Sequence, residues 1–265
     1  MSLAAPELLD RRILAAITFV DPIGLPIASP VRVTAEGVRA VAKRPGELIL
    51  VAAPQLANYA ESFDLPAAPA VGSVRVALDV LPADPRYLPR RVTLALPRDP
   101  EPSNRNAPGS LFRAVEIALP PSPAVPLPGI AAGLIVTVRR ADDQRRVEGA
   151  LVRLTAPGGA QTASLTNAAG EAMLIASVPL SSTGPGATVH PDVAASYAVI
   201  VDPALARFHA DADLTAARSG AATHASGFID PDDLLSRLAN QASPEQAVRI
   251  ASGRTRAATF AWTPP

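Results

Sequence analysis

The stretch that decides the fold contains two segments in which apolar residues alternate with others. The first is Leu134-Ile135-Val136-Thr137-Val138-Arg139, where Leu134, Val136 and Val138 share one parity. The second is Glu148-Gly149-Ala150-Leu151-Val152-Arg153-Leu154, where every second residue from Ala150 onward is apolar. Alternation with a period of two predicts β-strands that place one face against a core.

A tight turn is expected within the next segment, Leu165-Thr166-Asn167-Ala168-Ala169-Gly170-Glu171-Ala172, where Gly170 can supply the positive φ that other residues resist. Together these segments resemble the carboxypeptidase-regulatory-like (transthyretin-like) β-sandwich, whose members show G-x-V-x-V, then V-x-G-A-x-V-x-L, then T-[ND]-x-x-G-x. The matching elements here are Gly133 to Val138 (one residue longer than the pattern), Val147 to Leu154, and Thr166 to Glu171. The resemblance implies a fold and little about activity, because such modules are mostly spacers, binders and assembly surfaces.

The rest of the second half is expected to complete this sandwich around an insertion. A strand is predicted at 196–201, and residues 202–247 depart from the family pattern. Within the insertion, Asp230-Pro231-Asp232-Asp233 predicts the start of a short helix over 234–239, since proline suits the first turn and acids suit the positive end of a helix. Residues 248–251 and 258–262 are interpreted as a hairpin that returns to the second sheet, with Phe260 and Trp262 as core or interface anchors.

The strand parities predict which residues share the core of this half. They are Val136, Val152, Leu154, Val199 and Ile250.

The first half shows more alternating segments separated by turn signals. They are Ile13–Phe19, Val31–Val33, Leu48–Val51, Val74–Val80, Val92–Leu96 and Val115–Leu119. Many short strands at this spacing predict an immunoglobulin-like sandwich. The segment Leu88–Asp99 is similar to accessory proteins found beside phage-tail and contractile-injection genes, so the whole chain resembles components of such particles.

A proline-rich segment, Pro120-Pro121-Ser122-Pro123-Ala124-Val125-Pro126-Leu127-Pro128, divides the two halves. Such a run favours stiff, extended geometry, which would hold two modules at a restricted angle. We therefore predict an all-β chain of two β-sandwich modules with one short helix in the second. The expected domains are residues 1–119, a linker at 120–129, and residues 130–265 with the insertion 202–247; fragments 1–119 and 130–265 are expected to fold separately.

Composition excludes several classes of function. The net charge is zero, so the chain has no excess of positive charge that would attract nucleic acid or an anionic membrane. The pairs Arg90-Arg91 and Arg139-Arg140 are interpreted as solvated strand ends. Cysteine is absent, which removes disulfides, thiolate metal sites and cysteine nucleophiles. No signal peptide or membrane span is visible, so we expect a protein that is cytoplasmic when synthesised and that leaves the cell, if at all, as part of a particle.

One group of residues could hold a divalent cation. In Phe208-His209-Ala210-Asp211-Ala212-Asp213, a strand would place His209, Asp211 and Asp213 on one face. The favoured interpretation is an exposed polar face without a metal, because no second histidine follows at helical spacing. Asp230, Asp232 and Asp233 could bind Ca²⁺ but lack the glycine and the final glutamate of an EF-hand loop, so helix capping is favoured. We therefore predict no cofactor and no enzyme activity.

Four aromatic residues are the interface candidates. Tyr59 and Phe63 lie in the loop 53–69, while Phe208 and Phe228 lie in the insertion. The favoured function is a non-enzymatic structural or assembly subunit of a phage-tail-like or contractile injection particle, which would be oligomeric and contact other protein subunits. The alternatives are a ligand-binding sandwich for glycan or peptide and, third, a metal-dependent enzyme that uses the His209 face.

Overall fold

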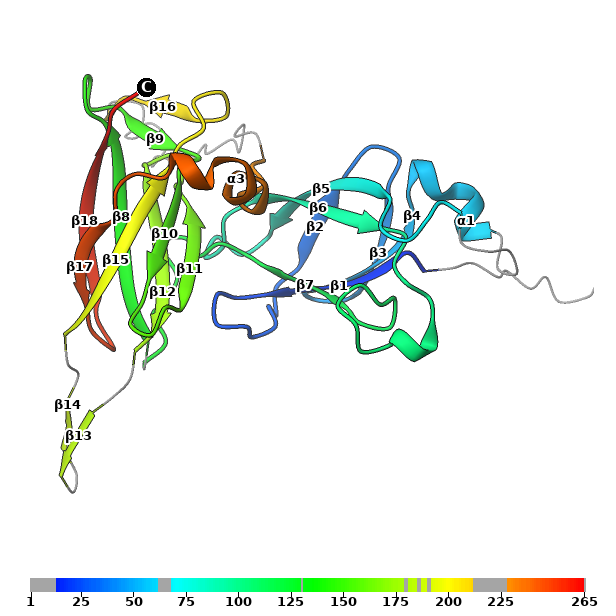
Figure 1. Ribbon diagram of the computed structural model, residues 1–265, viewed down its shortest axis with the longest axis horizontal. Helices are drawn as coiled ribbons and strands as arrows, with labels where there is room; N and C mark the ends of the chain where they lie inside the picture. Colours follow the sequence, from blue (N-terminus) through cyan, green and yellow to red (C-terminus); the bar gives the residue numbers. More distant parts are fainter. Residues whose placement is uncertain are drawn as a thin grey trace, which may run out of the picture.

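The computed structural model describes residues 13–61, 68–129, 131–178, 181–184, 187–189, 192–211 and 228–264. The first module, residues 13–119, consists of two sheets with the strand orders β3-β4-β1-β7 and β2-β5-β6 (Figure 1). Its elements are β1 (Ala15–Val20), β2 (Val31–Thr34), β3 (Arg39–Arg44), β4 (Glu47–Ala52), a 3-10 turn (Pro54–Leu56), α1 (Ala57–Glu61), β5 (Val74–Pro82), β6 (Arg90–Leu96), a 3-10 turn (Pro102–Asn104) and β7 (Val115–Ala118). Neighbouring strands are antiparallel except for β1 and β7, which are parallel.

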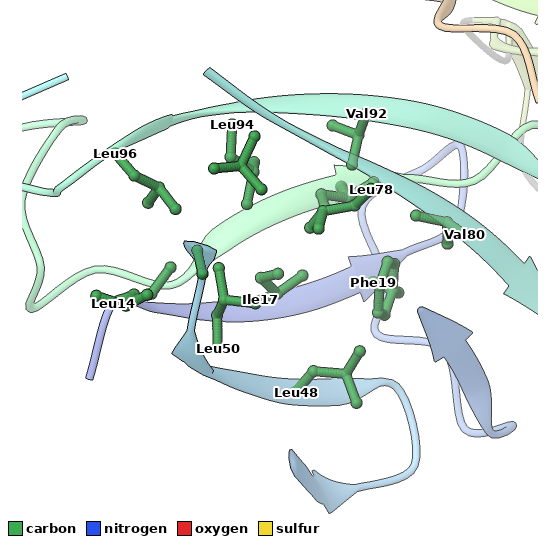
Figure 2. Packing of buried hydrophobic residues seen from close by; sticks show 14 of the residues in the cluster. Leu14, Ile17, Phe19, Leu48, Leu50, Leu78, Val80, Val92, Leu94 and Leu96 are labelled. Atoms are coloured by element: carbon green, nitrogen blue, oxygen red, sulfur yellow. The ribbon is translucent and has the colours of Figure 1, made fainter. Parts of the chain in front are cut away.

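One apolar core lies between these two sheets. Figure 2 shows Phe19 of β1 and Leu50 of β4 facing Leu78 of β5 and Leu94 of β6. The first strand begins later than predicted. Ile13 precedes β1 and is 44% exposed, whereas the next residue, Leu14, is buried. The strand β3 was not predicted, because three of its six residues are basic and its side chains are largely exposed.

The second module, residues 131–264, is also built of two sheets. Their strand orders are β11-β10-β15-β17 and β12-β8-β9-β16, and β18 pairs with β8 in the second sheet. The elements are β8 (Ala131–Arg140), β9 (Arg146–Glu148), β10 (Leu151–Thr155), β11 (Gln161–Leu165), β12 (Glu171–Ser177), β15 (Val193–Ile200), β16 (Arg207–His209), α3 (Pro231–Leu238), a 3-10 turn (Ala239–Gln241), β17 (Gln246–Ile250) and β18 (Thr255–Trp262). A separate pair is formed by β13 (Ser181–Gly184) and β14 (Ala187–Val189). The all-β class and the sandwich architecture are therefore confirmed, whereas separate folding of the two modules stays a prediction.

The core of the second module contains all five residues that strand parity predicted, which confirms that prediction. Val136, Val152, Leu154, Val199 and Ile250 belong to one buried cluster. The predicted C-terminal hairpin is wrong. β17 pairs antiparallel with β15 in one sheet, while β18 crosses to the other sheet and runs parallel to β8. The inward faces of β17 and β18 therefore close the same core from opposite sheets.

The turn before β12 has the predicted construction. Gly170 has a φ of +70°, and a Cβ at this position would lie 2.7 Å from the carbonyl oxygen of Val138. The Asn167 side chain accepts a hydrogen bond from the backbone N–H of Glu171 (3.0 Å). The buried hydroxyl of Thr166 donates to the carbonyl of Val147 (2.6 Å) and accepts from the N–H of Ala150 (2.9 Å). This threonine therefore ties the turn to the strands on which the family resemblance rests.

The proline-rich linker is packed against both modules. On the first module, the N–H of Leu88 donates to the carbonyl of Pro120, and the N–H of Ser122 donates to the carbonyl of Arg86, both at 2.8 Å. On the second module, Val125 and Leu127 pack against a small apolar cluster that includes Met173 and Ile175. The linker is thus held by contacts along its length in addition to the intrinsic stiffness of proline.

The short helices α1 and α3 accompany the sandwiches. The helix predicted at 234–239 is observed as α3, with Asp230 as its N-cap and Pro231 in the first turn. The helix α1 occupies the loop that was predicted to be irregular, and it covers one end of the first core.

No helix in the described part of the chain is long and apolar enough to cross a membrane.

Replacing Val152 by Asp tests the core of the second module. Val152 is fully buried, so the new carboxylate would lose its hydration without gaining a partner, and we expect a loss of about 3 kcal/mol or more in the free energy of unfolding. The control is Ala163→Asp on the exposed face of β11, which should change stability by less than about 1 kcal/mol. Urea unfolding of the two variants measures both, and equal effects would contradict the assignment of Val152 to the core.

Candidate functional site

The most unusual side chain in the described structure is Arg90 at the start of β6. It is only 6% exposed, and it lies between the two modules. Strand alternation explains its burial, because Arg90 has the same parity as Val92, Leu94 and Leu96, which all face the core. The interpretation of Arg90 as a solvated strand end is therefore wrong, whereas Arg91, of opposite parity, is half-exposed and pairs with Asp79 at 2.7 Å. The alternation was visible in the sequence, and it is the signal that would have identified Arg90.

The guanidinium of Arg90 is satisfied by groups from both modules. From the first module, the carbonyl of Ala118 accepts a hydrogen bond from Nη1 at 3.0 Å. From the second, the carboxylate of Asp232 accepts from Nη2 at 2.5 Å, and the carboxylate of Asp230 lies 3.7 Å from the same nitrogen. Because a buried charge is costly without partners, these contacts are what make the position tolerable.

Asp230 has three roles at this junction. Its Oδ1 atom caps α3 by accepting hydrogen bonds from the N–H groups of Asp232 (3.1 Å) and Asp233 (3.4 Å). Its Oδ2 atom accepts a hydrogen bond from the hydroxyl of Thr93 on β6 at 2.9 Å. Its carboxylate also faces Arg90. The predicted capping role is therefore confirmed, and the same residue joins the helix to the first module.

The opposite side of α3 is anchored in the second module. Ile229 and Leu234 pack with Leu151 of β10, Leu165 of β11 and Ile200 of β15, on the outer face of that sheet. A backbone hydrogen bond, 2.8 Å long, runs from the N–H of Arg91 to the carbonyl of Ile229. Figure 1 shows α3 at the place where the modules meet. The segment 229–238 therefore connects an apolar face of one sandwich to a buried cation of the other. We call the contacts of Arg90, Thr93, Asp230 and Asp232 the junction.

The candidate metal ligands are engaged by other protein groups. Nε2 of His209 lies 2.6 Å from the carboxylate of Glu148, and the carboxylate of Asp211 accepts a hydrogen bond from Arg146 at 2.9 Å. Arg139 lies 3.4 Å from the same carboxylate. Asp213 lies outside the described residues. No group of three or more His, Asp or Glu side chains converges as a metal site in the regions that the structure describes.

These arginines also set the charge state of Asp211. The hydrogen bond from Arg146 lowers the pKa of the Asp211 carboxyl below its ordinary value of 3.8, and Arg139 adds to this effect. The stabilisation that comes with the lowered pKa is present above the ordinary pKa and is lost as the pH falls through the lowered one. At neutral pH the ionised carboxylate of Asp211 is therefore paired with two arginines.

The four aromatic interface candidates have different surroundings. Tyr59 is not available as an exposed interface residue. The helix α1 places its side chain in the first core, where it is 3% exposed. Phe63 lies outside the described residues. Phe208 is half-buried and stacks on Trp262, with ring centroids 5.9 Å apart and planes 8° from parallel, while the Arg140 guanidinium lies 5.0 Å from the centre of the Phe208 ring. Phe228 is half-buried beside Ile229 at the start of the α3 segment.

Other apolar side chains that the sequence did not single out are exposed on turns of the first module. Ile23 is 43% exposed and Leu25 is 58% exposed, on a turn whose N–H groups at both residues donate to Asp21. Phe112 is 58% exposed in the loop between β6 and β7, where its N–H donates to the hydroxyl of Ser110. These side chains are presented by hydrogen-bonded turns, and such anchors suit contacts with another protein.

A shallow hollow lies on the surface of the first module. Its volume is about 210 Å³, below the usual size of a small-molecule pocket. The lining residues are Ala35, Glu36, Val38, Pro54, Gln55, Arg75, Val76 and Ala77. None of these is aromatic, so the hollow offers no ring for stacking on a sugar.

Comparisons with known proteins give only distant similarities. No protein-family model matches the chain, and no curated protein matches it. One similar solved structure is the Bacillus anthracis TIE protein, with 9% identity and a TM-score of 0.28 over 95% of this chain and 34% of that one. Another is a streptococcal ancillary pilin, with 8% identity and a TM-score of 0.25 over 85% of this chain and 50% of that one. The chain thus spans about a third of the first protein and half of the second.

The junction predicts a large difference between two neighbouring arginines. Arg90→Met keeps the length of the side chain but leaves the mostly buried carboxylate of Asp230 without its cation, so we expect a loss of about 2–4 kcal/mol in the free energy of unfolding. Arg91→Met breaks only a solvent-exposed pair and should cost less than about 1 kcal/mol. Urea unfolding of both variants compares them, and an equal cost would show that the burial of Arg90 has no energetic consequence.

The contacts of His209 and Asp211 predict that this face binds no metal. Protein purified without added metal should contain no stoichiometric zinc, manganese or calcium when it is measured by inductively coupled plasma mass spectrometry. The matched control is His209→Ala. Metal that is present in the intact chain and lost in His209→Ala would contradict the prediction and favour the enzyme alternative.

Proposed function

We propose that this chain is a non-enzymatic structural subunit that acts through protein–protein contacts. The observation that supports this best is the junction, because a buried, hydrogen-bonded cation and a packed linker join two sandwiches into one stiff unit. A stiff unit of this kind can set the distance and angle between two partners. A flexible tether would serve that purpose poorly.

The turns of the first module supply suitable contact points. Leu25 and Phe112 are large apolar side chains held out by hydrogen-bonded turns, and a few such anchors carry most of the affinity in protein interfaces. The finer proposal is an accessory component of a phage-tail-like or contractile injection particle, whose C-terminal half is a carboxypeptidase-regulatory-like module. This finer proposal rests on the sequence resemblances of residues 88–99 and 133–171. It also includes synthesis in the cytoplasm and no contact with nucleic acid or membrane.

The proposal is tested by co-purification of the tagged full-length chain with the products of its neighbouring genes. We expect recruitment of at least one of these products, and we expect Leu25→Asp with Phe112→Asp to reduce it at least tenfold while the melting temperature stays unchanged. The matched control is Val71→Asp, which changes another side chain of similar exposure (48%). Failure to recruit any product, together with binding of glycans or peptides, would replace the proposal with the ligand-binding alternative.

A further inference from the structure

The strand β18 forms one edge of its sheet over its whole length. It pairs in parallel with β8 from Thr255 to Trp262 without a shift of register. The N–H of Gly133 donates to the carbonyl of Arg254 (2.9 Å), and the N–H of Ala141 donates to the carbonyl of Trp262 (2.8 Å). Since backbone groups point alternately to the two sides of a strand, the even-numbered residues of β18 are bonded to β8. The N–H and C=O groups of Thr255, Ala257, Thr259 and Ala261 therefore point away from the sheet.

This outward edge is open to solvent. Among the residues whose placement is described, no strand pairs with it, and all four outward residues are exposed. Figure 1 shows β18 along the side of the second module that faces away from the first module. An exposed row of unpaired backbone groups is a template for pairing with another strand.

Two other sheet edges, those of β3 and β6, are protected from such pairing. β3 carries Arg39, Lys43 and Arg44, and its pairing with β4 is irregular at two places. The edge of β6 is met by the segment before α3, since the N–H of Arg91 is bonded to Ile229. By contrast, the stretch 257–262 of β18 has no charged residue and no proline. β18 therefore carries a single charge, Arg256 near its start, and among the residues that the structure describes it has no bulge and no covering segment to block its edge.

We propose that β18 pairs antiparallel with β18 of a second copy of this chain, about a two-fold axis at Ala258. In this register Thr255 lies opposite Ala261 of the second copy, and Ala257 lies opposite its Thr259. Each such pair exchanges two backbone hydrogen bonds, so every outward group of the strand is satisfied. A two-fold axis also closes the assembly at two copies.

The length of the strand and its one charge favour this register. An axis at Ala257 would set Ala261 opposite Gly253, and an axis at Thr259 would set Thr255 opposite Thr263, so each would leave an outward residue without a partner inside β18. With the axis at Ala258, the cationic Arg256 lies opposite Phe260 of the second copy. An axis at Arg256 would place two arginines directly opposite each other, which is destabilising, and would leave Ala261 beyond the paired strand. An axis at Phe260 would set Ala257 opposite Thr263, beyond the end of β18, and would leave Thr255 without a partner in the strand. The inference goes beyond the proposed function, because the partner is a second copy rather than another subunit.

Sedimentation of the purified full-length chain tests the pairing. We expect a dimer of twice 27.3 kDa. Thr259→Pro removes an outward N–H and leaves the bonds to β8 intact, and Ala257→Lys adds a charge to the edge. Each should give a monomer with little change in melting temperature, whereas the control Ala42→Lys on the exposed edge strand β3 should stay dimeric. A monomeric intact chain, or dimers in both edge variants, would overturn the proposal whatever the result of the recruitment experiment.

The register has its own test, because the chain contains no cysteine of its own. The Ala257→Cys and Thr259→Cys variants are mixed and oxidised mildly. Residues directly opposite each other are close enough for a disulfide, and residues two positions apart along the strand are not. We expect a cross-linked dimer from the mixture and little from Ala257→Cys alone; efficient cross-linking of Ala257→Cys with itself would contradict the axis at Ala258.

Discussion

The arrangement of the two sandwiches depends on the burial of Arg90 against the acidic start of α3. The first module supplies the cation and the carbonyl of Ala118, and the second supplies Asp230 and Asp232. Separating the two modules would break the contacts of Arg90 with Asp230 and Asp232 and the hydrogen bonds of Thr93 and Arg91 to the segment 229–230. A buried ion pair contributes modestly to net stability, because the loss of hydration offsets much of the attraction, but separating its partners is costly. The junction therefore acts mainly on orientation.

The helix α3 makes this arrangement possible because its two sides have different chemistry. Its N-terminal turn carries clustered acids that favour the positive end of the helix dipole, and the same acids meet Arg90. Leu234 and the preceding Ile229 anchor the segment on the outer face of β10, β11 and β15. The linker adds a second line of contact through Ser122 and Leu127. A segment that departs from the resemblance in the second half thus supplies the contact between the halves.

Much of this structure could be predicted from local patterns. Alternation identified the principal strands and five members of the second core, and turn chemistry identified the role of Gly170. The errors arose where contacts between distant segments decide the structure. The pairing of β18 with the opposite sheet, the formation of the edge strand β3 and the burial of Tyr59 all depend on such contacts, which one sequence does not reveal. Arg90 is different: its inward parity is visible in the sequence, but an arginine is rarely buried unless it is paired, and its partners Asp230 and Asp232 are distant in the sequence. At the candidate metal site the sequence showed the ligand types but not the arginines that engage Asp211.

The orientation of the two modules is the most direct test of this account. One cysteine is introduced on an exposed site of each module, at Ala42 and Ala163, and both are spin-labelled. The labelled chain is diluted with an excess of unlabelled chain, so that distances between copies do not contribute, and the distance distribution between the two labels is measured by pulsed electron spin resonance. We predict one narrow distribution for the intact chain and a broad one when Arg90→Met is added, while Arg91→Met leaves the distribution narrow. A broad distribution in the intact chain, or a narrow one that Arg90→Met does not change, would contradict the claim that the junction fixes the two sandwiches.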